Sequence, residues 1–333
     1  MSLNPVTNRR RFVGSIASFL LARPLVVGGQ SAARVYRLGI LRLGRFATDD
    51  AYSFPVLLGD LGYVEGRNLV VERRSADGKS ERMPGLAREL VDLRVDAILA
   101  VGSIATAAAK VATSTIPVVF LDNGDPVAAG LVQSLARPGG NITGVLITPE
   151  GASLAGKRVE LLRESVPRAA RIALLAPDQQ GVTWSQAQET RAAASSLRLG
   201  LDVVEVVDGD YARAFATIAA LRPQALVVGA NAGFVRDRKT IIELAARYRL
   251  PAIYEWPRQV KDGGLMSYGA NDLETYRQVA SYIDRLFKGA KPSDMPIWLP
   301  SKLHLVLNLK TARALGLTIP RSVLLRADEV IRE

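Results

Sequence analysis

Short apolar runs alternate along most of the chain with longer stretches in which apolar residues recur every three or four positions. Runs of about seven residues bounded by Gly, Pro, Asn or Asp are typical of buried strands, whereas the three-to-four spacing is typical of amphipathic helices. This pattern predicts helices over 80–93, 184–200 and 238–250. It predicts strands over 35–41, 68–74, 95–102, 116–122, 141–147, 171–177, 201–207 and 224–230.

Strands that alternate with helices indicate parallel sheets covered by helices on both faces. There are roughly five such units in each half of the chain, more than one sheet holds comfortably, so we expect an α/β protein with two doubly wound domains. The alternation ends in the last quarter, where 263–272, 291–309 and 314–320 carry Gly and Pro between short apolar runs. Such segments suit a chain that crosses back between two domains.

The first 33 residues have the composition of an export signal. Arg9, Arg10 and Arg11 precede an apolar stretch from Val13 to about residue 22, and small residues follow up to Ala33. This order matches a secretory signal peptide cleaved near Ala33, and the arginines followed by a hydrophobic pair resemble a twin-arginine signal. A retained membrane anchor and a disordered basic tail are the alternatives. The interpretation as a signal peptide predicts a periplasmic protein.

Composition excludes several classes of chemistry. The chain has no cysteine, and His304 is its one histidine, so zinc–sulfur, thiolate and Ser-His schemes lack parts. The phosphate-binding, dinucleotide-binding and nucleophile-elbow motifs are absent as well. We therefore expect neither an enzyme nor a bound cofactor or metal. The net charge of +11 comes with interleaved acids rather than a basic block, which argues against a nucleic-acid partner.

Ligands of open parallel sheets bind beyond the carboxyl ends of the strands, and this rule selects the candidate site residues. In the first half they are Gly44 and Arg45 after the first strand, and Gly102, Ser103 and Ile104 after the third. Gly102 and Ser103 open a helix whose free N–H groups suit an anion, although Ser103 could also only cap that helix.

The fourth strand is followed by Asp122, Asn123 and Asp125, which offer oxygens to an ammonium group but also have the composition of a tight turn. In the second half, Asp178, Trp184 and Asn231 occupy the equivalent positions. The ring of Trp184 could stack on a ligand or cover the start of its own helix.

Long motifs identify the family that the chain resembles. They read "DLGYVEGRNLVVERR", "ATSTIPVVFLDNGDPVAAGLVQSLARPGGNITGV", "LAARYRLPAIY", "GGLMSYG" and "FKGAKPSDMPIWLPSKLHLVLNLKTARALGLTIPRSVLLRADEVI". In this order they resemble the substrate-binding proteins of ABC transporters typified by bacterial tryptophan and aromatic amino-acid binding proteins, and the resemblance covers about 35–332.

The resemblance implies the type I periplasmic binding-protein fold, in which a three-stranded hinge joins two α/β lobes and the ligand is trapped between them. It places the first lobe at 34–148 plus 268–298 and the second at 149–267 plus 299–333. By the same resemblance Ser103 binds a ligand carboxylate, Asp125 lies at the cleft edge and Tyr268 lies at the hinge.

The resemblance also implies partners. We expect a monomer that carries a small solute to an ABC permease in the inner membrane. A sensing component that signals to a membrane receptor is the alternative with the same fold. Where the family commonly has an acid in the second lobe, this chain has Asn231. Asn is neutral, so we expect a carboxylate-bearing ligand without a free α-amino group unless Asp125 or Asp178 supplies the charge.

Overall fold

The computed structural model describes residues 34–46, 54–149, 154–177 and 182–333. Val35–Glu333 form one compact unit. Among the described residues, no helix combines the length and the apolar character that crossing a bilayer requires. The signal peptide expected over 1–33 lies outside the described residues.

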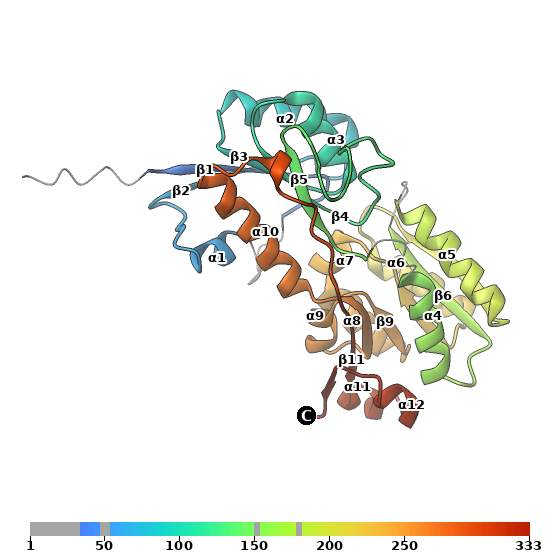
Figure 1. Cartoon of the computed structure of the whole chain (residues 1–333). Coiled ribbons are helices and arrows are strands. Elements are labelled where there is room, and N and C mark those ends of the chain that lie inside the picture. Colours follow the sequence, from blue (N-terminus) through green and yellow to red (C-terminus); the bar gives the residue numbers. More distant parts are fainter. Residues whose placement is uncertain (1–33, 47–53, 150–153, 178–181) are drawn as a thin grey trace, which may run out of the picture. The chain divides into compact units, whose positions relative to one another are not determined.

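The first sheet contains five strands in the order β2-β1-β3-β4-β5, and all of its neighbouring pairs are parallel. Helices α2 and α3 cover one face, and α1 and α10 cover the other (Figure 1). Because both faces are covered, the strands carry continuous apolar runs rather than alternating ones. The elements are β1 (Tyr36–Arg42), α1 (Phe54–Gly59), β2 (Leu69–Ser75), η1 (Ser80–Arg82), α2 (Met83–Asp92), β3 (Ala97–Val101), α3 (Ser103–Ala112), β4 (Val118–Asp122), β5 (Ile142–Leu146), α10 (Asp272–Phe287) and η2 (Pro292–Asp294).

The second sheet contains seven strands in the order β12-β11-β10-β9-β8-β6-β7. Helices α4, α5, α11 and α12 pack on one face, and α6 and α8 pack on the other. The elements are α4 (Leu154–Ser165), β6 (Arg171–Pro177), α5 (Val182–Ser196), β7 (Gly200–Val206), α6 (Tyr211–Leu221), β8 (Ala225–Val228), α7 (Ala232–Arg236), α8 (Arg238–Arg247), β9 (Ala252–Tyr254), α9 (Pro257–Lys261), β10 (Met266–Ala270), β11 (Leu303–Asn308), α11 (Leu309–Ala314), α12 (Arg321–Leu324) and β12 (Glu329–Ile331).

The two doubly wound sheets confirm the predicted fold class, and each predicted strand forms within a few residues of its expected bounds. The second sheet has one antiparallel pair, since β11 runs antiparallel to β10, and both strands lie in the last quarter of the chain, where the alternation of strands and helices ends. The chain reaches β11 after a return through the first sheet, where Trp298 bridges Val145, and so it enters from the opposite end. It passes between the sheets before α4, between β10 and α10, and before β11.

The segment around Tyr268, expected at the hinge, lies inside the second sheet. Tyr268 belongs to β10 and pairs with Leu305 of β11, and the passage to the first sheet follows at Asn271. The strand forms there because β9 and β11 both supply hydrogen-bonding partners to β10. The lobe boundaries within 34–333 stay a prediction.

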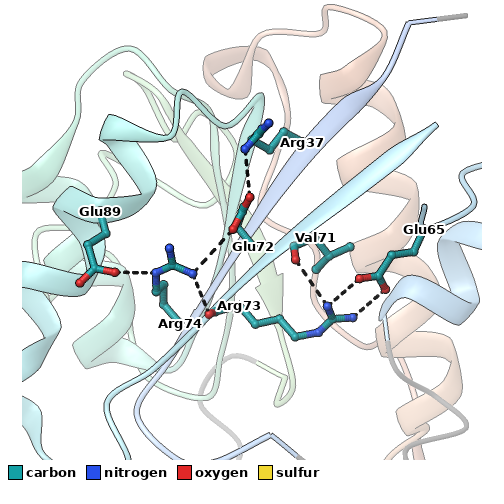
Figure 2. Close-up of polar contacts among 7 residues, drawn as sticks. All are labelled: Arg37, Glu65, Val71, Glu72, Arg73, Arg74 and Glu89. Atoms are coloured by element: carbon teal, nitrogen blue, oxygen red, sulfur yellow. Dashed lines mark hydrogen bonds and ion pairs between the residues drawn. The ribbon is translucent and has the colours of Figure 1, made fainter. Parts of the chain in front are cut away.

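Strand β2 is an edge of the first sheet, and it carries paired charges (Figure 2). Arg73 donates to both carboxylate oxygens of Glu65 at 2.7 and 2.8 Å, and Arg74 donates to Glu89 at 2.7 Å. The Arg73 hydrogen bond holds the pKa of Glu65 below its usual range. Charged side chains on an edge strand discourage pairing with other chains. These arginines therefore protect a sheet edge and do not form a stripe of unpaired positive charge.

Candidate functional site

The N-terminus of α3 lies at the carboxyl end of β3, as the sequence predicts. Gly102 is the N-cap, with φ of 91° and ψ of 158°, and the helix start has no side-chain cap. A backbone with this φ strongly favours glycine. The first intrahelical bond runs from Thr106 N to Gly102 O at 3.0 Å. The N–H groups before it have no partner within the helix and suit an anion.

Beside this helix start, the carboxyl end of β4 presents Asp122. Its side chain is buried, with 6% of the residue exposed. Oδ1 accepts hydrogen bonds from Asn123 N at 2.7 Å and Gly124 N at 3.3 Å. A methyl carbon placed on Gly124 would lie 3.4 Å from Ser103 Oγ and 3.9 Å from both carboxylate oxygens of Asp122. The structure thus brings Ser103 and Asp122 to one small space, which we call the first-sheet site (Gly102, Ser103, Asp122 and Gly124).

Asp125 and Asn123 belong to the turn that follows. Asp125 is exposed, and its Oδ1 accepts from Val127 N and Ala128 N, both at 2.9 Å. Asn123 is half-buried and donates its backbone N–H to Asp122. Asp125 therefore has the contacts of a turn cap, the interpretation that its sequence context also allowed.

The remaining candidate site residues of the first half of the sequence are Gly44, Arg45 and Ile104. The carbonyl of Gly44 accepts from Ser75 Oγ at 3.1 Å, which joins the ends of β1 and β2. Arg45 is exposed, and Ile104 is 36% exposed on the first turn of α3. They lie at the predicted strand ends, where an exposed cation and an exposed apolar side chain are available to a ligand.

In the second sheet, Asn231 caps a helix. It is the N-cap of α7, and its Oδ1 accepts from Gly233 N at 2.7 Å. Because the side-chain oxygen of Asn231 already accepts a backbone hydrogen bond, the N–H groups of its side-chain amide remain for a ligand. Asp178 lies outside the described residues, as does the side chain of Trp184, whose helix α5 begins at Val182.

Sequence reasoning missed Gln186, which positions the loop before Asn231. Gln186 Oε1 accepts from Ala230 N at 2.8 Å, and its Nε2 donates to Ala230 O at 3.3 Å. A side-chain amide that meets both backbone groups of one residue holds that residue as a neighbouring strand would. No sequence signal indicates this, because the partners are 44 residues apart.

An acid near Asn231 is already neutralised. Asp237 accepts from Tyr211 Oη at 2.6 Å and from Arg236 Nε at 2.7 Å. Burial acts to raise the pKa of Asp237, but the Arg236 and Tyr211 hydrogen bonds prevail and hold it below the usual range. Burial and the same contact raise the pKa of Tyr211. This carboxylate is therefore engaged within its own lobe.

Two buried ion pairs lie near the ends of β9 and β10, and the sequence analysis did not predict them. Arg158 donates through Nε to Tyr268 O at 2.9 Å and through a terminal nitrogen to Glu255 Oε1 at 3.2 Å, with 3% and 5% of the two side chains exposed. Burial raises the pKa of Glu255, and the Arg158 charge opposes that shift. Arg258 pairs with Asp272 at the start of α10. Among the described residues no group of three His, Cys, Asp or Glu side chains is placed to hold a metal ion.

Comparison with known proteins identifies the family of the chain. The profile described as ABC transporter substrate binding protein matches residues 55–331. The tyrosine-binding protein of Clostridioides difficile strain R20291 is 24% identical over 267 residues, covering 80% of this chain and 76% of that protein.

Two crystal structures share the fold. An ABC domain in complex with L-Trp from Streptococcus pneumoniae is 26% identical, with a TM-score of 0.72, and covers 88% of this chain and 100% of its own. A conserved domain protein from Vibrio cholerae O1 biovar eltor is 24% identical, with a TM-score of 0.74 and coverages of 89% and 100%. Since the profile spans most of the sequence, the chain belongs to the family of ABC transporter substrate-binding proteins.

Proposed function

We propose that the chain is the periplasmic solute-binding protein of an ABC importer and that it traps a small carboxylate-bearing aromatic solute between its two lobes. It acts as a monomer, delivers the solute to an inner-membrane permease and catalyses no reaction. The family supports the transport role. The similar tyrosine-binding protein and the similar domain crystallised with L-Trp support an aromatic ligand.

The main support for a carboxylate on the ligand is the start of α3, which has no side-chain cap. Its free N–H groups and the Ser103 hydroxyl all donate, and the helix dipole adds positive potential there. Hydrogen bonds to a charged acceptor contribute about 1.5–3 kcal/mol each. A ligand carboxylate in place of the missing cap satisfies these donors.

Calorimetric titration with aromatic acids and aromatic amino acids tests this function. We expect Ser103→Ala to weaken binding by about 1.5–3 kcal/mol, the scale of one hydrogen bond to a charged group. The control is Ser196→Ala at the end of α5, where the hydroxyl donates to Ala193 O at 2.8 Å. Equal affinities of wild type and Ser103→Ala would return Ser103 to the role of a helix residue without ligand contact.

The export part of the proposal has its own measurement. If the signal peptide is cleaved after Ala33, the intact mass of protein from the periplasmic fraction corresponds to a chain that starts at Arg34. Periplasmic protein that still starts at Met1 would contradict cleavage. Protein found only in the membrane fraction would favour a retained anchor.

A further inference from the structure

We propose that the second sheet carries a separate binding site for a short-chain monocarboxylate, in a cavity at the amino-terminal ends of β9 and β10. The cavity has a volume of about 90 Å³ and is lined by residues of α8, β9, α11 and the turn before β10. Asn231 follows the carboxyl end of β8, as ligand residues of parallel sheets do. This cavity therefore lies at the opposite end of the strands.

The walls of the cavity are mainly apolar. Ile242 belongs to α8 and Leu250 follows it, Leu265 precedes β10, and Leu315 follows α11. The first three of these residues are buried. In another protein an engineered apolar cavity of about 150 Å³ binds benzene, so a cavity of about 90 Å³ has room for about four non-hydrogen atoms. The apolar part of a ligand must therefore be a short chain.

Tyr254 brings a hydroxyl donor to this cavity. Only 1% of the residue is exposed, and its ring lies over Gly264, where a β-carbon would lie 2.7 Å from Tyr254 Cε2. The hydroxyl has no hydrogen-bonding partner among the described residues, and burial alone raises its pKa. It is also not one of the buried polar atoms that are cut off from solvent. The hydroxyl therefore faces the cavity, which Tyr254 lines, and an oxygen of a ligand can accept its hydrogen bond.

Arg249 places a positive charge at the mouth of the same cavity. The residue is exposed and lines the cavity, so the cavity reaches the surface there. Arg249 follows the end of α8 with φ of 52°, and the carbonyl end of a helix favours a cation. Among the described residues no carboxylate pairs with Arg249, and no Asp or Glu lines the cavity. Its guanidinium group is therefore available to an anion.

The groups that the cavity offers to a ligand are all donors. The hydroxyl of Thr311 also lines the cavity, but it already donates to Gly263 O at 2.8 Å. The Tyr254 hydroxyl and the Arg249 guanidinium remain, and both require an acceptor. An anionic oxygen accepts more strongly than a neutral one and is attracted by the guanidinium charge. A carboxylate with a short alkyl chain, such as butyrate, therefore matches both the donors and the apolar walls.

Titration of the full chain with butyrate, followed by ligand-observed NMR, tests this site. We expect a dissociation constant on the order of 1 mM, which a ligand of about six non-hydrogen atoms can reach. The comparison ligands are 1-butanol, which has no charge, and butylammonium, which has the opposite charge. Both should bind at least roughly threefold more weakly, because they lack the charged acceptor.

Two variants remove the donors one at a time. Tyr254→Phe keeps the ring and should weaken butyrate binding at least roughly tenfold, the factor for one hydrogen bond to a charged group. Arg249→Gln should weaken it by about twofold to fivefold, the scale of an exposed ion pair. Arg247→Gln is the matched control, because Arg247 is an exposed cation of the same helix that does not line the cavity. Circular dichroism checks that each variant folds.

Ser103→Ala separates this site from the start of α3, which also suits a carboxylate. We expect butyrate to bind Ser103→Ala and wild type with the same affinity, because Ser103 does not line the cavity. Butyrate binding that Ser103→Ala abolishes would assign the ligand to α3 and overturn the inference.

Three further results would overturn the inference and leave the proposed function intact, since that function rests on other residues. The first is no binding of butyrate at concentrations well above the expected dissociation constant. The second is a butyrate affinity that Tyr254→Phe leaves unchanged. The third is binding of 1-butanol or butylammonium as tight as that of butyrate, which would exclude a site built for a carboxylate.

Discussion

The buried pair of Arg158 and Glu255 gives a sharp test of what stabilises the second sheet. Replacing Arg158 with Met keeps the apolar part of the side chain but removes its charge and its bond to Tyr268 O. Glu255, which is 4% exposed in the wild-type structure, then lacks its cation. Removing one partner of a buried pair costs about 3–5 kcal/mol, because the remaining charge must be desolvated alone or neutralised.

Urea unfolding followed by circular dichroism measures this loss. With an m-value of about 3 kcal/mol/M, the midpoint should fall by about 1–1.7 M. Replacing both residues with Met should recover most of the stability, since no buried charge remains. Lys157→Met on the same helix is the control. It breaks the exposed pair with Glu160, 2.7 Å apart, and should cost less than about 0.5 kcal/mol.

The pH dependence of Arg158→Met follows from Glu255. Burial already raises the pKa of Glu255, and losing the cation removes the charge that opposes this shift. When the folded-state pKa of Glu255 is raised, burying its carboxyl costs least in the protonated form. The loss of stability in Arg158→Met should therefore be largest near pH 8, where Glu255 is charged. It should shrink as the pH falls toward the unfolded-state pKa of Glu255. A variant within about 1 kcal/mol of wild type, or a double variant that costs the sum of both single changes, would refute the reasoning.

Three more changes have defined outcomes. Gly124→Ala places a methyl at ordinary contact distance, 3.4 Å from the nearest side-chain oxygen, so the urea midpoint should be unchanged while calorimetry shows weaker ligand binding. Gly144→Ala drives a methyl into the buried ring of Phe120, well inside van der Waals contact, and should cost about 1–3 kcal/mol in urea unfolding; an unchanged midpoint would mean that the ring moves freely. Arg73→Met should raise the pKa of Glu65 toward its usual value, as NMR titration can measure. Because the wild-type pKa of Glu65 is depressed, the Arg73–Glu65 pair stabilises the fold above the unfolded-state pKa of Glu65 and loses that effect as the pH falls. A Glu65 pKa that is the same in Arg73→Met and in wild type would contradict this pairing.

The amino-acid sequence by itself determined the layered α/β architecture. Apolar runs over positions such as 118–122 are buried on both faces, and a run of that length between turn residues leaves few alternatives to a strand in a covered parallel sheet. The sequence nearby also determines where α3 begins. Gly102 and Ser103 follow a strand directly, and the positive φ at residue 102 favours glycine. Both features depend on residues that lie close to one another in the sequence.

Only the tertiary structure decided which distant groups meet. The antiparallel entry of β11 depends on a return through the first sheet, and the Arg158–Glu255 pair joins residues 97 positions apart. The first-sheet site likewise depends on two strand ends lying side by side, which places Asp122 near Ser103 around an open Gly124. Local periodicity fixes which face of an element is apolar, but electrostatic and packing partners across elements are set by register and crossing, which no short window of sequence encodes.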